Sequence, residues 1–316
     1  MPVPSPRAEA TVLVTGAYSV DLVLTDLRGP VSSGTEVWAS GLDMVPGGAF
    51  TLALGLHRLG RRAVWAADFG TDVFSREVLA TARREGMDER GFRHHQRPVR
   101  NVTVALSDPQ DRAMIAYEDP VAKRPLAELI DTFRPAVVML PYLQFGPDMT
   151  AALEVAARQG ARVFMDCQHY PGHIGMDDVR KTLSQVDVFA PNEPEALRVT
   201  RADTVEVALA LLCELVPTVV IKRGPAGAVA AADGRRADHP SLTVPVVDTT
   251  GAGDCFNVGF LHRWMDGRPL HDCLAAGTVC GAAAVTGMGS SNALNATDLS
   301  TWLTRLGAEQ GKRRRV

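Results

Sequence analysis

The stretch V-V-D-T-T-G-A-G-D-C-F-N-V-G-F-L, residues 246–261, changes after Gly253 from a turn-like sequence to an apolar pattern with helical spacing. The pattern predicts a helix that opens at the turn Gly251-Ala252-Gly253 and carries apolar side chains at Phe256, Val258, Phe260 and Leu261. Backbone N–H groups and the positive end of a helix dipole point toward such a turn, and glycine lets an anion approach the chain closely. We therefore expect the turn to receive an anion such as a phosphate.

Asp254 places a carboxylate in the first turn of this predicted helix, where it would repel a phosphate bound at the same spot. One interpretation is a charge that favours the helix dipole and contributes about 0.3–1 kcal/mol. The other is that a phosphoryl group is received at the turn while the carboxylate takes a proton from the accepting hydroxyl. The stretch alone leaves both interpretations open.

Length and composition limit the fold. With 316 residues, of which 46% are hydrophobic, the chain can bury a sizeable core as one large α/β domain. Two compact domains are also compatible with this length.

Charge and cysteine content limit the partners and the compartment. A net charge of −3 and a pI near 6.2 give no reason to expect nucleic acid or an acidic membrane as a partner. The five cysteines include no C-x-x-C pair, which suits reduced thiols. The N-terminal M-P-V-P-S-P-R has no apolar targeting region, and no stretch of about 18 apolar residues occurs. We expect a soluble, cytoplasmic protein.

Short, continuously apolar segments rich in β-branched residues alternate with helical patterns along the chain. This alternation predicts a doubly wound, mostly parallel sheet with helices on both faces and ligands at the carboxyl ends of its strands. The predicted strands are 11–15, 62–67, 136–140, 162–166, 187–190 and 218–222.

Two segments interrupt this alternation. Residues 29–46 are rich in Gly, Ser and Pro, and residues 93–120 contain N-V-T-V-A-L-S and A-M-I-A-Y around D-P-Q-D, as in a β-hairpin. Neither has an obvious helix, so we expect both to form a small β-rich lid. The prediction is one α/β domain over residues 10–310 that carries this lid, with flexible tails at 1–9 and 311–316.

Two common nucleotide-binding motifs are missing. The start V-L-V-T-G-A looks like the first strand of a dinucleotide-binding fold, but no G-x-G-x-x-G follows it. The sequence also lacks G-x-x-x-x-G-K-[ST], so phosphate chemistry here would not use a P-loop.

Four stretches, in this order and spacing, together resemble the ribokinase-like (PfkB) carbohydrate kinases. They are P-G-G-A-F-T-L-A-L-G-L-H-R-L-G (46–60), P-N-E-P-E-A (191–196), K-R-G-P-A-G (222–227) and D-T-T-G-A-G-D (248–254). The last is highly specific, the first moderately so, and the middle two are weak alone. The resemblance spans about residues 10–290 and implies a kinase that transfers the γ-phosphoryl group of ATP to a hydroxymethyl group of a sugar or sugar-like molecule.

The resemblance also implies roles for the residues at the turn. Asp254 matches the catalytic base of the family, and Gly251, Ala252 and Gly253 match its anion hole. The anion hole would stabilise charge on the transferring phosphoryl group while the carboxylate serves the acceptor hydroxyl.

Residues on the nucleotide side follow from the two middle motifs. Asn192 and Glu195 match a family motif that acts on Mg²⁺ through water, although a polar helix cap is the alternative for this pair. Lys222, Gly224 and Gly227 match the region of the nucleotide phosphates and ribose, and Lys222 is equally interpretable as a surface charge at a strand end.

Residues on the acceptor side match the beginning of the family pattern. Gly47 and Gly48 match its di-glycine hinge between lid and core. Asp21 matches an aspartate that accepts hydrogen bonds from sugar hydroxyls, although an aspartate that ends a strand is also common. Arg112 is a further candidate that would reach the substrate from the lid.

Leu52 departs from the family pattern, which carries an asparagine four residues after the second glycine. An apolar side chain there puts simple ribose and fructose in doubt, because their hydroxyls would lack a partner. A less hydroxylated acceptor or a nucleoside would suffer less, so a nucleoside kinase is an alternative. A non-catalytic ligand-binding or regulatory protein on the kinase fold is another.

The resemblance implies a cation and a partner as well. Asp248 and Thr250 are candidate ligands for K⁺, as in family members with a potassium site, with carbonyls of the loop near Gly287 to Ser291 completing the coordination. Pairing of two lids implies a homodimer.

Overall fold

The computed structural model describes residues 11–107, 112–168, 172–289 and 292–313. Its main sheet has eight strands in the order β14-β13-β12-β11-β10-β9-β1-β4, in which only β13 and β14 run antiparallel to their neighbours. The strands are β1 (Val12–Thr15), β4 (Ala63–Ala66), β9 (Val137–Leu140), β10 (Arg162–Met165), β11 (Val188–Phe189), β12 (Thr218–Lys222), β13 (Ala228–Ala232) and β14 (Arg235–His239). The predicted mostly parallel sheet is confirmed.

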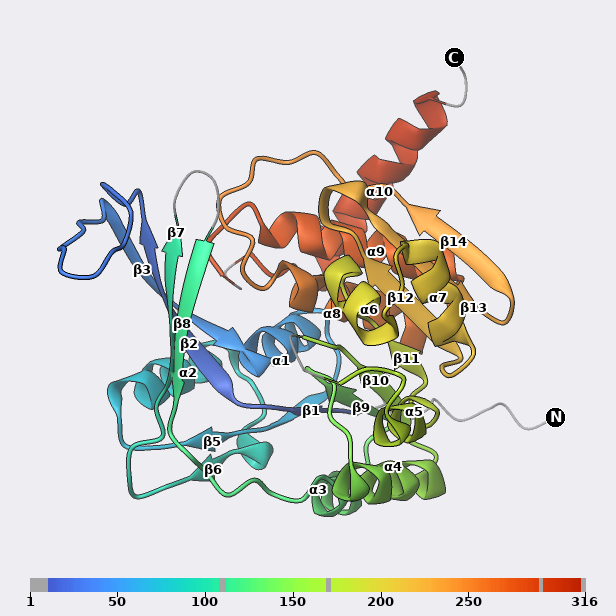
Figure 1. Ribbon diagram of the computed structural model, residues 1–316, viewed down its shortest axis with the longest axis horizontal. Helices are drawn as coiled ribbons and strands as arrows, with labels where there is room; N and C mark the ends of the chain where they lie inside the picture. Colours follow the sequence, from blue (N-terminus) through green and yellow to red (C-terminus); the bar gives the residue numbers. More distant parts are fainter. Residues whose placement is uncertain (1–10, 108–111, 169–171, 290–291, 314–316) are drawn as a thin grey trace.

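Helices cover both faces of this sheet, as Figure 1 shows. One group packs on one face: α1 (Ala49–Arg58), α2 (Val73–Glu85), α8 (Ala252–Met265), α9 (Leu270–Ala284) and α10 (Ala296–Arg313). The other face carries α3 (Leu126–Phe133), α4 (Pro147–Gln159), α5 (Asp177–Leu183), α6 (Glu193–Thr200) and α7 (Val205–Cys213). Two short 3-10 turns, Glu89–Gly91 and Gly224–Ala226, complete the helical elements of the described residues.

Alternate side chains of the strands belong to two hydrophobic cores, one on each face of the sheet. Val12 and Val14 of β1 belong to the core under α1, α8 and α9, whereas Leu13 between them belongs to the core under α3 to α7. Successive side chains of a strand point to opposite faces, so a continuously apolar strand serves both cores. Among the described residues, no helix is long and apolar enough to cross a membrane.

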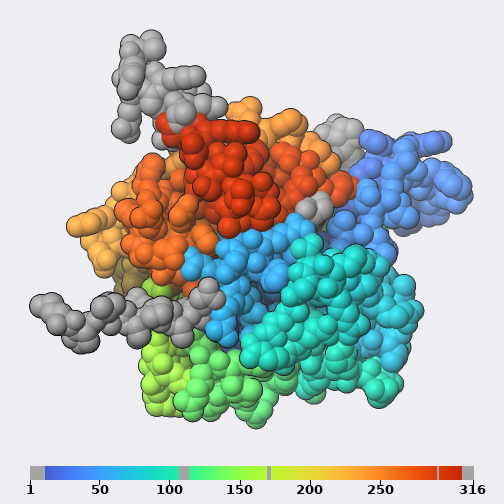
Figure 2. Space-filling model, turned by 180° about the vertical axis from the view of Figure 1, so that it is seen from behind, coloured from blue at the N-terminus to red at the C-terminus, as the bar shows by residue number. Residues whose placement is uncertain are grey.

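A separate four-stranded sheet stands beside the main one and projects from the body of the molecule (Figures 1 and 2). Its order is β3-β2-β7-β8, with β2 at Tyr18–Thr25, β3 at Gly41–Gly48, β7 at Asn101–Ser107 and β8 at Arg112–Glu118. The predicted hairpin is confirmed, because β7 and β8 pair antiparallel; its D-P-Q-D connection lies outside the described residues. We call this small sheet the lid.

The lid differs from the predicted segments in three places. β2 belongs to it although the sequence pattern ended the first strand at Thr15 and assigned no strand to 18–25. β3 begins only at Gly41, and residues 29–40 form no strand. β6 (Arg93–His94) pairs with β5 (Asp68–Phe69) in a third, two-stranded sheet. At the C-terminus, α10 extends to Arg313 and so includes part of the predicted tail.

Candidate active site

The turn before α8 has the geometry expected of an anion site. Gly251 occupies the N-cap with φ 74° and ψ 0°, a left-handed conformation that favours glycine. The helix starts with the bond from the N–H of Cys255 to the carbonyl of Gly251 (2.9 Å). No side chain caps this end, so backbone N–H groups of the first turn point toward the space in front of the helix.

Asp248 ties this turn to a second loop. Its Oδ1 accepts hydrogen bonds from the backbone N–H and the hydroxyl of Thr250 at 3.0 and 2.8 Å, and its Oδ2 accepts one from the N–H of Gly289 at 3.0 Å. The structure therefore brings the two predicted potassium ligands together beside part of the loop that was expected to complete their coordination. Ser290 and Ser291 of that loop lie outside the described residues.

A buried polar cluster lies beside the same turn. Lys222, at the carboxyl end of β12, places its Nζ 2.7 Å from Oδ2 of Asp166, which follows β10. Asn257 of α8 donates from Nδ2 to the same Asp166 oxygen at 2.6 Å. A Cβ atom on Gly253 would lie 3.6 Å from Lys222 Nζ, so the ammonium group is next to the anion turn.

Asp254 sits at the N-terminus of α8 where several carboxylates converge. It is partly accessible to solvent, yet it lies deep among protein atoms. Burial raises the pKa of Asp254 to about 7, with a further rise from Asp166, a lowering by Lys222, and smaller rises from Asp21 and Glu195. These influences indicate that the four other charged groups lie around the space next to Asp254.

Asp21 enters this space from the lid. It lies in β2, is 5% exposed, and accepts a hydrogen bond at Oδ1 from the hydroxyl of Ser19 (2.8 Å). Its pairing partners are Val45 of β3 and Thr103 of β7, so the three side chains share one face of the lid.

The two predicted hinge glycines are required for separate reasons. A Cβ on Gly47 would meet Oδ2 of Asp21 at 2.4 Å, so glycine leaves room for this carboxylate. Gly48 has φ 63°, and a Cβ there would lie 2.8 Å from the carbonyl oxygen of Ala17. Glycine therefore permits both the turn into α1 and the close approach to β2.

On the nucleotide side, the cap predicted as the alternative for Asn192 and Glu195 is present. Asn192 Oδ1 accepts from the N–H of Glu195 at 2.9 Å, and Glu195 Oε2 accepts from the N–H of Asn192 at 2.8 Å, which is a capping box at the start of α6. Burial, and then Asp166, raise the pKa of Glu195. This capping role leaves Oε1 of Glu195 and the Nδ2 donor of Asn192 for other partners.

The remaining nucleotide-side residues follow β12. Lys222 is paired rather than a free surface charge, which removes that alternative. Gly224 and Gly227 both have positive φ, 52° and 87°, and a Cβ on Gly227 would lie 2.1 Å from the carbonyl oxygen of His239. These two positions therefore hold the loop after β12 in a conformation that favours glycine.

The other two residues that were predicted to contact the acceptor, Leu52 and Arg112, lie in the hydrophobic core and at the far end of the lid. Leu52 is 1% exposed and packs in the hydrophobic core under α1, so it has little surface with which to contact a ligand. Arg112 begins β8 at the lid end farthest from its root, and its side chain lies outside the described structure.

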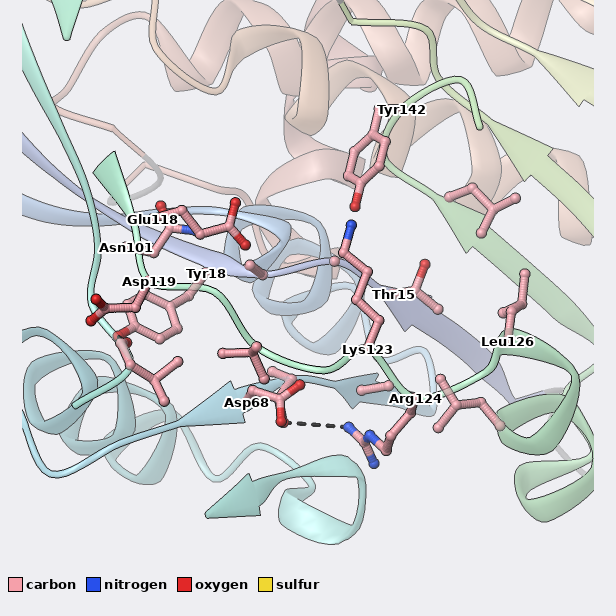
Figure 3. A pocket seen from close by; sticks show the side chains of 18 of the residues that line it. Thr15, Tyr18, Asp68, Asn101, Glu118, Asp119, Lys123, Arg124, Leu126 and Tyr142 are labelled. Carbon is pink, nitrogen blue, oxygen red and sulfur yellow. Dashed lines mark hydrogen bonds between the residues drawn. The ribbon is translucent and has the colours of Figure 1, made fainter. Parts of the chain in front are cut away.

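A cavity of about 130 Å³ lies between the lid and the carboxyl ends of β1, β4 and β9. Figure 3 shows Tyr142 and Lys123 pointing toward one another on one side and Glu118 and Asn101 on the other. The hydroxyl of Thr15 lines the cavity and has no hydrogen-bond partner among the described residues. The cavity reaches the hinge through Ala17, whose carbonyl accepts from the N–H of Ala49 (3.0 Å).

Asp166 and Asn257 were missed by sequence reasoning. Asp166 directly follows a predicted buried strand, and side chains at carboxyl ends of parallel strands commonly face ligands. Asn257 is three residues after Asp254 and thus shares its face of α8. Both signals were available, but each is common in proteins and weak on its own.

The site combines a carboxylate with a near-neutral pKa, a helix N-terminus without a side-chain cap and a buried ammonium group. These are the parts that a phosphoryl transfer needs: a base for the acceptor hydroxyl and positive potential for the transferring group.

Comparisons with known proteins agree with this chemistry. A model of the family described as pfkB family carbohydrate kinase matches residues 11–297. The probable fructokinase-4 of Arabidopsis thaliana is 27% identical over 314 residues, which cover 91% of this chain and 95% of the relative. The cytidine kinase of Thermococcus kodakarensis is 40% identical, but over 105 residues that cover 32% of this chain and 37% of the relative.

The fold also has solved counterparts. The Arabidopsis thaliana ribokinase complexed with ribose and ATP superposes with a TM-score of 0.76 at 19% identity, over 93% of this chain and 98% of that one. At this identity the likeness concerns the fold alone.

Proposed function

The chain belongs to the pfkB family of carbohydrate kinases and is a phosphotransferase, and on this premise we propose that it transfers the γ-phosphoryl group of ATP to a hydroxymethyl group of a sugar or sugar-containing small molecule. The observation that carries the proposal is the position of Asp254. Its carboxylate has a pKa near 7 and stands in the first turn of α8, directly after the anion turn.

In the proposed mechanism Asp254 takes the proton of the acceptor hydroxyl as the oxygen attacks the γ-phosphorus, and the bond from the γ-phosphorus to the bridging oxygen breaks so that ADP leaves. A base whose pKa lies near the working pH is deprotonated often enough to act and still basic enough to accept a proton. The N–H groups of the turn Gly251–Gly253 and the ammonium group of Lys222 meet the negative charge on the transferring group.

We assign the nucleotide to the strand ends beside Lys222. Lys222, Gly224 and Gly227 lie next to the phosphates and ribose, and Asn192 lies with them. A loop held by positive-φ glycines lets a nucleotide approach the backbone, which supports the assignment.

The residues present fit a magnesium ion held through water. Glu195 and Asp166 are close enough for Asp166 to raise the pKa of Glu195, and such paired carboxylates attract a hard cation. Among the described residues, no cluster of three or more His, Cys, Asp or Glu side chains forms a ready cage for a metal. This favours an ion coordinated mainly by water and phosphate oxygens, which would neutralise phosphate charge, with Asn192 and Glu195 as outer partners.

We assign the acceptor to the space between Asp21, the di-glycine hinge and Asp254. The carboxylate of Asp21 accepts hydrogen bonds from acceptor hydroxyls, and Gly47 lets the acceptor approach the backbone. Because Leu52 is buried in the core under α1, it does not limit the number of hydroxyls on this acceptor.

A nucleoside is the second candidate acceptor. The cavity next to the hinge is about 130 Å³, is lined by Tyr142, Asn101 and Gln144, and contains the unpartnered Thr15 hydroxyl. An aromatic face together with amide groups suits a planar, hydrogen-bonding ring.

A screen of ADP release, coupled to an indicator reaction, tests the proposal against pentoses, hexoses, deoxy and acid sugars, and nucleosides. We expect acceptor-dependent ADP release with at least one of these classes, and the class identifies the acceptor. ADP release that no acceptor increases, with ATP and Mg²⁺ present, would contradict the proposed transfer.

We also propose that K⁺ binds near Asp248 and Thr250 and orients the anion turn. The bonds from Thr250 and from Gly289 to Asp248 hold two oxygen-bearing segments together, which supports such a site. We expect higher kcat in potassium buffer than in a buffer of a bulky organic cation. Equal values would remove the potassium assignment without affecting the kinase assignment.

Finally, we propose a homodimer that pairs the outer faces of two lids. On the face opposite Asp21, the strand register aligns Met44, Leu22, Val104 and Ile115 in one row across the sheet. Leu42 and Ile115 are 66% and 64% exposed, and an apolar face of this kind on a four-stranded sheet requires covering.

A further inference from the structure

A second cavity, of about 260 Å³, lies far from the proposed active site. It is lined by His239 at the end of β14, by Arg263 in the last turn of α8, by the α8–α9 connection and by α10. Because α8 has 14 residues, this cavity lies about 20 Å along the helix from the anion turn. Figure 2 shows the face on which the orange segments of α8 and α9 meet the red α10.

The most unusual group in this cavity is His239. Its side chain is 2% exposed, and its Nε2 has no hydrogen-bond partner among the described residues. Its Nδ1 lies 2.8 Å from the carbonyl oxygen of Pro240, which can only accept, so Nδ1 carries a proton.

The protonation of Nδ1 fixes what Nε2 offers to a ligand. Burial lowers the pKa of His239, with a further lowering by His271, so the ring is neutral near pH 7. Nε2 is then an acceptor without a partner, on a ring that lines the cavity, and leaving such a buried group unpaired costs about 1–3 kcal/mol. A ligand that donates a hydrogen bond would remove this cost.

Cations surround the same cavity. The guanidinium groups of Arg263 and Arg268 make no hydrogen bond or ion pair with any described residue, whereas His271 is paired with Asp272 at 3.8 Å. The cavity also lies at the N-terminus of α9, whose first turn has no side-chain cap. Asp272 supplies the only carboxylate among the described lining residues, so two arginines face one acid.

The remaining wall is apolar. Ala275 of α9 and Leu303 and Leu306 of α10 line the side away from the arginines. The cavity thus combines positive charge, one buried acceptor and a carbon surface, and its size suits a small organic molecule rather than a bare ion.

We infer that this cavity is a binding site for a phosphate monoester of a small polyol. Arg263 and Arg268 bind the phosphate, which guanidinium groups match in geometry. A hydroxyl of the polyol donates to Nε2 of His239, and its carbon skeleton lies on Leu303 and Leu306. The inference concerns a site separate from the catalytic centre and does not depend on which acceptor the kinase uses.

Isothermal titration of the full chain with three probes tests the site. Glycerol 3-phosphate has both recognised groups, inorganic phosphate has only the anion, and glycerol has only the hydroxyls. We expect glycerol 3-phosphate to bind more tightly than phosphate, and glycerol not to bind. Arg268→Gln, an exposed position, should weaken glycerol 3-phosphate by about tenfold or more. Arg305→Gln, an exposed position on α10 outside the cavity, serves as the matched control and should bind like the wild type.

Two further variants test whether His239 accepts the hydrogen bond of the ligand and whether the ligand binds away from the anion turn. His239→Phe should abolish the preference for glycerol 3-phosphate over phosphate, and its melting temperature shows whether it folds; if it does not, Arg268→Gln still decides. Lys222→Met removes the cation at the catalytic turn and should leave the binding unchanged.

Three outcomes would overturn the inference. They are no binding of glycerol 3-phosphate at millimolar concentration, equal weakening by Arg268→Gln and Arg305→Gln, and loss of binding in Lys222→Met with retention in Arg268→Gln. The last would mean that the phosphate occupies the anion turn instead.

Discussion

The ammonium group of Lys222 lies 2.7 Å from the carboxylate of Asp166, and their side chains are 12% and 8% exposed. Asp166 is also the strongest charged neighbour that raises the pKa of Asp254, while Lys222 lowers that pKa. The pair thus holds a positive charge beside the anion turn and a negative charge beside the proposed base. Removing the Asp166 charge should therefore lower the pKa of Asp254, and removing the Lys222 charge should raise it.

Asp166→Asn should move the acidic limb of kcat/KM to lower pH. The substitution removes a negative charge and frees Lys222, and both effects lower the pKa of Asp254. It should also destabilise the fold by about 3 kcal/mol, because the buried ammonium group loses its partner. The measurement is a pH–rate profile beside a urea titration. Asp266→Asn, at the other end of α8, is the control and should not shift the acidic limb of the profile. An acidic limb that Asp166→Asn leaves unshifted would contradict the influence of Asp166 on the pKa of Asp254.

The stability difference between Asp254→Asn and the wild type should depend on pH. The folded pKa of Asp254, about 7, is above the ordinary value of 3.8, so the folded state holds a proton that the unfolded chain releases between these two values. The contribution of this group to wild-type stability is therefore present at low pH and is lost as pH rises toward 7. Asparagine does not titrate, so urea titrations at about pH 5 and pH 8 should show the variant gaining relative to the wild type at the higher pH. A difference that is the same at both values would mean that the pKa of Asp254 is not raised.

Gly47→Ala should weaken acceptor binding selectively. The new methyl group would lie 2.4 Å from Oδ2 of Asp21 and displace that carboxylate. We expect the acceptor KM to rise about tenfold or more, since a hydrogen bond to a charged group is lost, and the KM for ATP to change little. Gly29→Ala is a matched control, because nothing lies within 4 Å of its Cβ position. If ATP and acceptor were affected equally, Asp21 would not be specific to the acceptor.

The outer face of the lid should control assembly. We expect light scattering to show a dimer for the wild type and a monomer for Ile115→Glu, because a buried charge in a paired apolar face is costly. Val207 is 50% exposed on α7, so Val207→Glu adds the same charge elsewhere and should remain dimeric. A wild type that is monomeric at micromolar concentration would rule out the lid dimer.

The parallel core of the fold could be predicted because its strands are short, apolar and β-branched. T-V-V-I-K at 218–222 is such a strand, and β12 has these bounds. β13 and β14 were missed because A-V-A-A-A and R-R-A-D-H carry little β-propensity, and pairing with β12 and packing under α9 decide their structure. β2 was missed because the chain turns at Gly16, where φ is 112°, and continues as a strand in a different sheet.

The site could be predicted only where residues are adjacent in sequence. The turn at Gly251–Gly253 with Asp254 is a local motif, so its chemistry is readable from the sequence. The pairing of Asp166 with Lys222 joins residues 56 positions apart, and no local pattern specifies it. Leu52 lies within a local motif and was still misjudged, because a position in a motif does not reveal whether its side chain faces the ligand or the core.

The central claim is that Asp254 is the base, and Asp254→Asn tests it most directly. Asparagine keeps the shape of the side chain and removes its charge, so an aspartate that served only to favour the helix dipole would be replaceable at a cost of about 0.3–1 kcal/mol with turnover intact. If Asp254 takes the proton of the acceptor, kcat should fall by about 10² to 10⁴, while ATP affinity holds or rises because a negative charge near the phosphates is gone. The measurement is kcat of the variant with the acceptor identified in the screen, beside its ATP affinity. A fall in kcat of about 10² or more with ATP affinity retained is the predicted result, and turnover within about threefold of the wild type would contradict the mechanism.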